Sequence, residues 1–246
     1  MNLVNKVAVI TGAGKGLGKE TAKILAKEGC KVIICSRNKE DLSKVQKEII
    51  DTDGVSEYFT VDVTNQKEVD SFIDMIMKKH KRIDIIVNNA GYVNDWKTLE
   101  KTTTEELEKS FETNIYSIFY FLRKVVPIMR KQNEGSIINI SSMAGKRGIP
   151  NLAVYSASKF AVIGFTQAVA KELEGSNVSC ITVCPGGMNT SMRSKVFGDM
   201  DSKKQQSPEF VANVIKDILI GNVKVPNGGD IIVRHGKITE INQRPD

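Results

Sequence analysis

The stretch that decides the fold is Thr11-Gly12-Ala13-Gly14-Lys15-Gly16-Leu17-Gly18. It follows the apolar run Lys6–Thr11, which is typical of a strand covered on both faces, and leads into Leu17–Glu28, where apolar residues recur at helical intervals. Glycines at such a turn let a pyrophosphate approach the free N–H groups of a helix N-terminus. The pattern GxGxxG read from Gly12 is not met, because Leu17 takes the place of its third glycine. The position of the stretch favours a nucleotide site over a purely structural turn.

Strand-length apolar runs and longer helical segments continue to alternate along the chain. Further strands are expected at Lys31–Cys35, Tyr58–Val61, Ile83–Val87, Ser136–Ile140, Val178–Val183 and Ile231–Val233. Further helices are expected at Lys39–Ile50, Gln66–Lys79, Thr104–Lys131, Ala153–Glu174 and Pro208–Ile220. This order implies right-handed crossovers and parallel pairing. The sequence therefore predicts one α/β domain over residues 1–246, a Rossmann-type doubly wound parallel sheet of seven strands with helices on both faces, carrying a substrate lid at about 188–207.

Composition excludes several classes of protein. The 246 residues are 41% hydrophobic and 26% charged, which is ordinary for a soluble globular chain. No apolar run approaches the roughly 20 residues that span a bilayer, and the first residues lack the pattern of an export signal. We therefore expect a cytoplasmic protein without membrane association. The net charge of +6 is interspersed with acids, which favours a solvated surface over a nucleic-acid partner.

The cysteines predict neither disulfides nor a metal site. Cys30, Cys35, Cys180 and Cys184 lie in or beside apolar runs, without a CxxC pair, and the chain has only two histidines. Buried thiols are the expected outcome.

Three further segments lie at the expected carboxyl ends of the strands, where ligands bind in a sheet of this kind. They are Asn88-Asn89-Ala90-Gly91, Asn139-Ile140-Ser141-Ser142 and Tyr155-Ser156-Ala157-Ser158-Lys159. Tyr155 and Lys159 are four residues apart, so they project from one face of a helix. Together with TGxxxGxG in the glycine stretch, these segments resemble, in type and order, the motifs of the short-chain dehydrogenase/reductase family. The resemblance covers essentially the whole chain.

The resemblance implies a catalytic set and a reaction. It makes Tyr155 the general acid and base, with Lys159 lowering the pKa of its phenol and holding the nicotinamide ribose. It makes Ser142, rather than Ser141, the partner of the substrate oxygen, because the family serine stands thirteen residues before the tyrosine. Asn114 matches the family asparagine that holds a water between the lysine and solvent. The implied reaction is hydride transfer between a nicotinamide and a carbonyl or secondary alcohol.

The resemblance also implies the cofactor site. Asp62-Val63 matches the family pair that meets the adenine. The full expected set is Thr11, Gly12, Gly14, Lys15, Gly16, Leu17, Gly18, Ser36, Arg37, Asp62, Val63, Asn89, Ala90, Gly91, Tyr155, Lys159, Pro185, Gly186 and Thr190. NAD-preferring members carry an acid at the end of the second strand, whereas Ser36-Arg37 suits a 2′-phosphate, with Lys15 as a second cation. The sequence predicts NADP(H), and the alternative is that Arg37 is a surface cation.

The substrate pocket is expected between the loop Ser142–Pro150, the segment after Gly91 and the stretch Met188–Ser207. Its expected lining is apolar and consists of Val93, Trp96, Met143, Met188, Met192, Val196 and Phe197. Such a lining favours a small-molecule ketone or secondary alcohol with an apolar body. Gly187 stands where the family commonly has a bulky apolar residue, which leaves the shape of that loop open.

Two alternative functions remain. A reductase of 3-oxoacyl groups on an acyl carrier protein would suit the basic surface, but the docking arginines of such enzymes align with Asn133 and Ser176. A non-catalytic dinucleotide-binding protein is less favoured, because Ser142, Tyr155 and Lys159 are all present.

Assembly is predicted from surplus apolar surface. Ile118-Phe119-Tyr120-Phe121 makes one expected helix apolar around much of its circumference, and Phe160, Ile163 and Phe165 extend this surface onto the next. Family members pair these two helices across a two-fold axis. We therefore expect a homodimer or homotetramer.

Overall fold

The computed structural model describes residues 1–243 and 245. Its centre is one sheet in the order β3-β2-β1-β4-β5-β6-β7-β8. The strands are β1 Val7–Thr11, β2 Lys31–Ser36, β3 Val55–Thr60, β4 Ile85–Asn88, β5 Gly135–Ile140, β6 Val178–Pro185, β7 Asp230–Arg234 and β8 Lys237–Asn242. Every neighbouring pair is parallel except β7 and β8. The strand order reverses beside β1, so a switch point lies at the carboxyl ends of β1 and β4.

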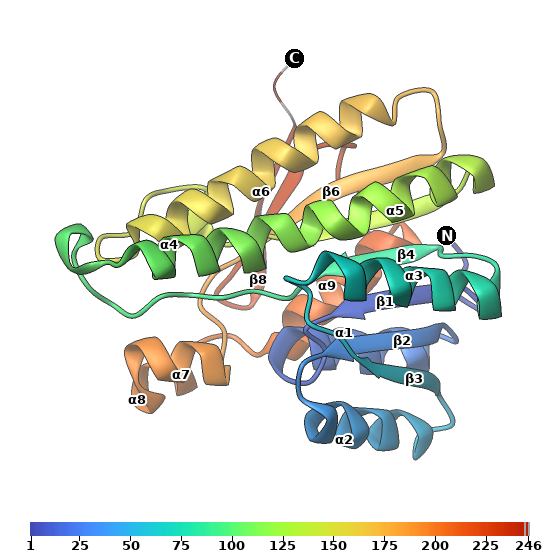
Figure 1. Ribbon diagram of the computed structural model, residues 1–246, viewed down its shortest axis with the longest axis horizontal. Helices are drawn as coiled ribbons and strands as arrows, with labels where there is room; N and C mark the ends of the chain where they lie inside the picture. The colour runs from blue at the N-terminus through green and yellow to red at the C-terminus, as the bar shows by residue number, and fades with distance from the viewer. Residues whose placement is uncertain (244, 246) are drawn as a thin grey trace.

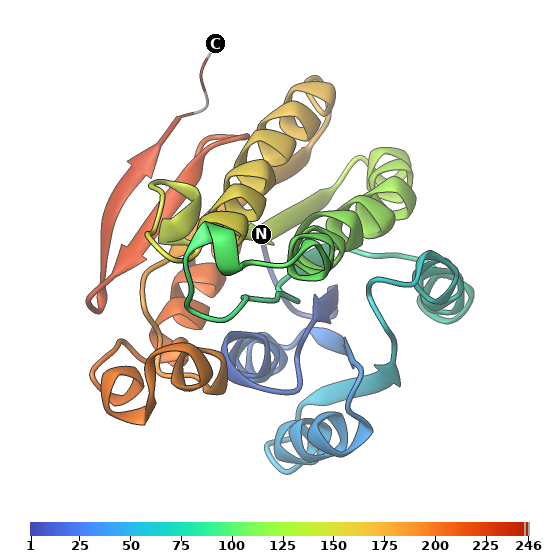
Figure 2. The ribbon, with the colours of Figure 1, turned by 60° about the vertical axis from the view of Figure 1, so that its left-hand side comes forward.

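Helices cover both faces of this sheet (Figures 1 and 2). They are α1 Gly16–Lys27, α2 Lys39–Ile50, α3 Gln66–His80, α4 Thr104–Phe111, α5 Ser117–Gln132, α6 Ala153–Glu172, α7 Ser191–Phe197, α8 Asp199–Lys203 and α9 Pro208–Ile220. Buried side chains of α1, α2 and α9 pack on one face of the sheet, and those of α3, α5 and α6 pack on the other. The predicted doubly wound single-domain fold is confirmed.

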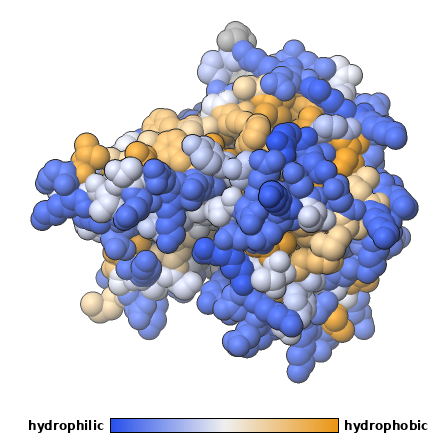
Figure 3. All heavy atoms as spheres, in the orientation of Figure 1, coloured by the Kyte–Doolittle hydropathy of each residue, from blue (hydrophilic) through white to orange (hydrophobic). Residues whose placement is uncertain are grey.

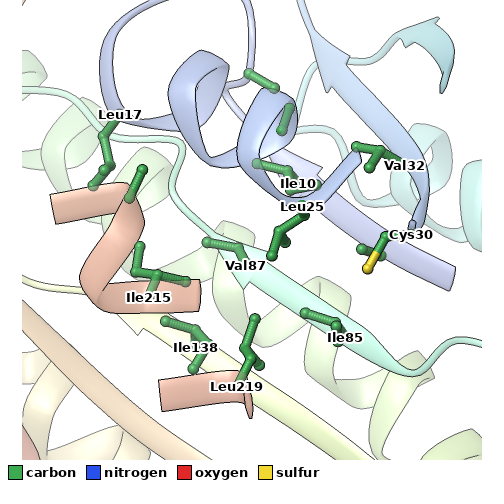
Figure 4. Packing of buried hydrophobic residues seen from close by; sticks show 14 of the residues in the cluster. Ile10, Leu17, Leu25, Cys30, Val32, Ile85, Val87, Ile138, Ile215 and Leu219 are labelled. Carbon is green, nitrogen blue, oxygen red and sulfur yellow. The ribbon is translucent and has the colours of Figure 1, made fainter. Parts of the chain in front are cut away.

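Strand β1 shows why both faces need helices. Ala8 and Ile10 join the core under α1 and α9, whereas Val7 and Val9 join the core under α3 and α5. Figure 4 shows the first of these cores, in which side chains of α1 and α9 meet side chains of the strands. Because its residues are buried on both faces, the strand reads as a continuous apolar run.

The prediction of seven strands was wrong, because the structure has an eighth. Strand β8 returns antiparallel to β7 through a tight turn at His235 and Gly236. Its six residues are mostly exposed, so no alternation of buried and polar positions marks it in the sequence. Asn242 Nδ2 donates to Asp230 Oδ2 at 3.0 Å, which ties the added strand to the start of β7.

The single helix expected at Thr104–Lys131 is also corrected. A π-helical turn, Glu112–Tyr116, separates α4 from α5. Such turns interrupt a helix without a breaking residue and are frequent at functional sites, so periodicity alone does not reveal them. Asn114 lies within this turn and is fully buried.

The remaining expectations concern thiols, metals and membranes. All four cysteines are buried free thiols, as predicted. Within residues 1–243 and 245, no group of three His, Cys, Asp or Glu side chains is placed to hold a metal ion. Over the same residues, no helix combines the length and the apolar character needed to cross a bilayer.

Candidate active site

The glycine turn between β1 and α1 is shaped for close approach to its backbone. Gly12 and Gly16 have φ angles of 63° and 54°, which L side chains rarely adopt. A Cβ on Gly12 would also lie 2.8 Å from the Cα of Ala90. Helix α1 then begins at Gly16 with no side-chain cap and no acidic residue in its first turn. Its first N–H groups are therefore available to an anion.

Hydrogen bonds join this turn to the segment after β4. The Thr11 hydroxyl accepts from the N–H groups of Asn89 at 3.0 Å and Ala90 at 2.9 Å. The Asn89 amide donates to the carbonyls of Thr11 at 2.9 Å and Gly12 at 3.2 Å. Two motifs that are distant in the sequence thus form one rigid unit at the switch point.

Gly18 makes this unit sensitive to a single methyl group. A Cβ at this position would lie 2.5 Å from the Asn89 Nδ2 and 2.6 Å from the Gly12 carbonyl oxygen. Gly18→Ala should therefore lower the free energy of unfolding by about 1–3 kcal/mol, the usual cost of overpacking. Urea denaturation followed by circular dichroism measures this change.

The matched control is Gly148→Ala, because a Cβ there meets nothing within 4 Å. We expect it to change the free energy of unfolding by less than about 1 kcal/mol. Equal unfolding midpoints for the parent and Gly18→Ala would contradict the close packing of α1 on the turn.

A cleft of about 280 Å³, which we call the crevice, lies at the switch point. It brings together most of the residues predicted to bind the cofactor: Gly12, Lys15, Gly16, Leu17, Ser36, Arg37, Asp62, Val63, Asn89, Ala90, Gly91, Tyr155, Lys159 and Thr190. Thr11, Gly14 and Gly18 are not part of its lining and serve the packing around it. Pro185 and Gly186 line a different cavity, described below.

Charged groups gather at the β2 end of the crevice. Lys15 and Arg37 both line it, and Arg37 is exposed. The Lys15 Nζ lies 3.0 Å from the Asp41 Oδ2, a pairing that the sequence prediction missed. Asn38 caps α2 by accepting from the Asp41 N–H at 2.9 Å, and the first turn of α2 then brings Asp41 against the glycine turn. The acidic residue in the first turn of the helix that follows β2 is the feature of the sequence that could have predicted this pairing.

At the other end of the crevice, α6 presents Tyr155 in its first turn and Lys159 one turn later. The Lys159 Nζ lies 5.8 Å from the centre of the Tyr155 ring and donates to the Ile140 carbonyl at 2.9 Å. Ser142, just after β5, lies near Tyr155, and its hydroxyl acts to lower the pKa of the phenol. Its hydroxyl also accepts from the Ala144 N–H at 3.1 Å. The end of β5 thus holds both Ser142 and the Lys159 ammonium near the phenol.

Burial controls the protonation of this pair. It raises the pKa of Tyr155, and Ser142 offsets only part of this effect. Burial also lowers the pKa of Lys159 to about 8. The resemblance implied a phenol pKa lowered by Lys159, whereas the structure raises it: desolvation outweighs the effect of Ser142, and the Lys159 amine donates to Ile140. The phenol is therefore held in its protonated form.

Asn114 anchors the segment that follows β4. Its Oδ1 accepts from the Tyr92 N–H at 2.8 Å, and its Nδ2 donates to the Tyr92 carbonyl at 2.9 Å and to the Ser158 hydroxyl at 2.8 Å. A Cβ on Gly91 would lie 3.4 Å from Asn114 Oδ1 and 3.7 Å from the Lys159 Nζ. The π-helical turn thus brings Asn114 close to Lys159, with Gly91 between them.

A second and larger cavity, of about 920 Å³, adjoins the crevice. Its lining includes Ser142 and every residue of the predicted apolar set, namely Val93, Trp96, Met143, Met188, Met192, Val196 and Phe197. Trp96 and Phe197 stack edge to face with their ring centres 5.0 Å apart. The crevice and the larger cavity share five lining residues, namely Tyr155, Ser141, Met188, Thr190 and Met192.

The segment 188–207, which was predicted to be a lid, contributes to the lining of this cavity. It contains α7 and α8, which project from the carboxyl-end edge of the sheet (Figures 1 and 2). Thr190 caps α7, and its methyl group lies close to Gly16 of the glycine turn. The space that a side chain at Gly187 would occupy is taken by Gln205 and Arg193, so this loop closes on the lid and leaves no room for the bulky residue common in the family.

A doubly wound sheet whose glycine-lined crevice meets a larger cavity at a tyrosine and a lysine has the architecture of dinucleotide-dependent oxidoreductases. Residues 6–201 match the short chain dehydrogenase family. The chain is 38% identical over 196 residues to the 3-oxoacyl-[acyl-carrier-protein] reductase FabG of Thermotoga maritima, which covers 80% of this chain and 79% of that protein. The chain therefore belongs to the short-chain dehydrogenase/reductase family, and it is an oxidoreductase.

Solved structures agree with this assignment. Levodione reductase superposes with a TM-score of 0.89 at 27% identity, covering 95% of this chain and 97% of that one. A 3-ketoacyl-(acyl-carrier-protein) reductase from Brucella melitensis, complexed with NADH, gives a TM-score of 0.87 at 29% identity, covering 94% and 97%. One of these proteins is named for levodione and the other for a carrier-bound acyl group, so the family alone does not assign the substrate.

Proposed function

We propose that the protein is an NADP(H)-dependent oxidoreductase that transfers a hydride between the nicotinamide and a carbonyl or secondary alcohol, with Tyr155 as general acid and base. The position of Tyr155 carries this proposal. Its side chain lines both the crevice and the larger cavity, so a group bound in either one can reach it. Ser142 lines the larger cavity beside it, and Lys159 lines the crevice.

The crevice fits a phosphorylated dinucleotide. The open N-terminus of α1 and the glycine turn suit a pyrophosphate, and Ser36 with Arg37 suits a 2′-phosphate. Asp62 lines the β3 side, where its Oδ1 accepts from the Thr64 hydroxyl at 2.8 Å. Its other oxygen is the one we assign to the adenine amino group. When bound, NADP(H) supplies or accepts the hydride.

Residues of the chain itself supply the proton for the reaction. In the direction of reduction, negative charge grows on the carbonyl oxygen, and Tyr155 donates its phenolic proton there while Ser142 donates a second hydrogen bond. The raised pKa of Tyr155 keeps that proton in place until it is needed. Lys159, with a pKa of about 8, stabilises the phenolate that remains until solvent returns a proton. Asn114 positions the segment beside Lys159 through its bonds to Tyr92.

The experiment that tests this proposal is a panel of ketones, followed by NADPH absorbance. Turnover of at least one ketone, with the corresponding alcohol as product, is the expected result. Tight NADPH binding without turnover of any carbonyl compound would instead favour a non-catalytic dinucleotide-binding protein.

A second candidate is the reduction of 3-oxoacyl groups on an acyl carrier protein. The names of the Thermotoga and Brucella proteins favour it. Asn133 and Ser176 stand at the positions where such reductases carry docking arginines, and this weighs against it. Comparing 3-oxoacyl carrier protein with the free ketones in the same assay separates the two candidates.

We also propose that the protein is a homo-oligomer paired through α5 and α6. Three large side chains are between 44% and 48% exposed here: Phe119 on α5, Phe160 on α6, and Tyr116 in the π-helical turn that precedes α5. Apolar surface gathers over the same region in Figure 3. Burying a phenylalanine against a partner contributes about 1.5–3 kcal/mol, so Phe119→Glu with Phe160→Glu should convert the oligomer to monomers, as measured by light scattering at about 10 µM protein.

Met200→Glu is the control, because Met200 is 83% exposed on α8, away from these helices. It should leave the mass of the oligomer unchanged. A monomeric mass for the parent protein would refute the proposed pairing.

A further inference from the structure

The larger cavity carries positive charge that the predicted apolar lining did not include. Besides its apolar residues, its lining contains the basic side chains Arg147, Arg193, Lys204, Arg234 and His235. No aspartate or glutamate occurs among the described residues that line it. None of these five basic residues lines the crevice, so the phosphates of a dinucleotide do not account for them.

Ion pairs distinguish these cations from one another. The Arg193 Nε lies 2.6 Å from the Asp201 Oδ1, so its charge is compensated within the lid. Within the part of the chain that the structure describes, Arg147, Lys204 and Arg234 make no ion pair with a carboxylate. The cavity therefore holds uncompensated positive charge.

The two uncompensated arginines line the same cavity as Ser142 and Tyr155. Arg147 follows the short helical turn Met143–Gly145, directly after Ser142. Arg234 ends β7, beside the last residues of β6, and its Cγ would lie 2.8 Å from a Cβ on Gly186. A guanidinium offers a planar pair of donors that matches the two oxygens of a carboxylate or phosphate.

We infer that the substrate is a carbonyl compound with an anionic group at a distance from its carbonyl, and that Arg147 and Arg234 bind this group. The inference rests on the proposed function and names the substrate class of the same site. The cavity, of about 920 Å³, has room for such an extended molecule, whose apolar middle would contact Trp96 and Phe197. A free carboxylate and the phosphate of a phosphopantetheine thioester share this chemistry.

The test compares matched substrates with and without an anionic group. The first pair is 7-oxooctanoate and its methyl ester, and the second is acetoacetyl-4′-phosphopantetheine and acetoacetyl-pantetheine. With the parent protein, kcat/KM for the anionic member should exceed that of the neutral member by about ten- to a hundredfold, through KM, because the charge is remote from the reaction. A preference confined to the first pair assigns a carboxylate, and one confined to the second assigns a phosphate.

Variants connect this preference to the two arginines. Arg147→Gln with Arg234→Gln should bring the ratio within each pair close to one, and the single change Arg147→Gln, at an exposed side chain, should reduce it. Lys27→Gln removes a charge at the end of α1, outside the cavity, and should leave the ratio unchanged. A ratio near one in the parent, or a ratio that the double variant retains, would overturn the inference.

A binding measurement separates this inference from the proposed function. Calorimetry gives the affinities of 7-oxooctanoate and its methyl ester for the protein without turnover. Preferential binding of the acid, lost in the double variant and weakened by salt, supports the inference even if no compound is reduced. Absence of reduction would then contradict only the proposed function. Equal affinities for acid and ester would overturn the inference, whatever the turnover.

Discussion

Tyr155→Phe should lower kcat for carbonyl reduction by about 10²–10⁴-fold, the usual contribution of general acid catalysis. The change keeps the aromatic ring between the two cavities and removes only the hydroxyl that donates the proton. The oxyanion also loses one of its two hydrogen-bond donors, since Ser142 alone remains. Single-turnover oxidation of NADPH with a ketone in excess measures the chemical step directly.

Tyr58→Phe on β3 provides the matched control, because it removes a phenolic hydroxyl outside both cavities. Its rate should equal that of the parent. If Tyr155→Phe turned over within about tenfold of the parent, another group would have to deliver the proton.

Ser36→Asp combined with Arg37→Ile should move the cofactor preference from NADPH toward NADH. The change places a carboxylate where the ribose hydroxyls are expected and removes the guanidinium from the β2 end of the crevice. A charged hydrogen bond contributes about 1.5–3 kcal/mol, and each 1.4 kcal/mol corresponds to about tenfold. The parent should favour NADPH at least about tenfold in kcat/KM, and the double variant should lose or reverse this preference.

Asp41 refines this prediction. Its carboxylate lies 3.0 Å from the Lys15 ammonium, so part of the positive charge beside Ser36 is already compensated. Asp41→Asn should release Lys15 toward a 2′-phosphate and increase the preference for NADPH. If the unmodified protein used NADH as well as NADPH, Arg37 would be a surface cation and the proposed selectivity would fail.

Most residues predicted to bind the cofactor line the crevice, and the glycine turn and the Asn89 segment among them follow strands that are buried on both faces. Such strands read as continuous apolar runs, and the carboxyl ends of parallel strands necessarily meet at one edge. The residues of the glycine turn, the Asn89 segment and the Tyr155 helix could therefore be placed together from the order of strands and helices alone. All seven apolar residues predicted for the substrate pocket do line the larger cavity.

What the sequence did not reveal depends on contacts rather than on local patterns. Strand β8 is mostly exposed, so no periodicity marks it. The π-helical turn at Asn114 has the same sequence pattern as a continuous α-helix, so the pattern does not distinguish the two. Arg147 and Arg234 come from segments far apart in the chain, and only the β6 and β7 pairing brings the second of them to the cavity. The raised pKa of Tyr155 likewise depends on burial, which spacing does not report.

The proposed hydride transfer is tested most directly by following the hydride itself. The protein is incubated with 7-oxooctanoate and NADPH that carries deuterium at the transferring C4 position, and the product is analysed by mass spectrometry. We predict an alcohol that holds one deuterium on the former carbonyl carbon with the parent protein, and almost none of this product with Tyr155→Phe. An alcohol without deuterium, or equal yields from the two proteins, would contradict hydride transfer with Tyr155 as the proton donor.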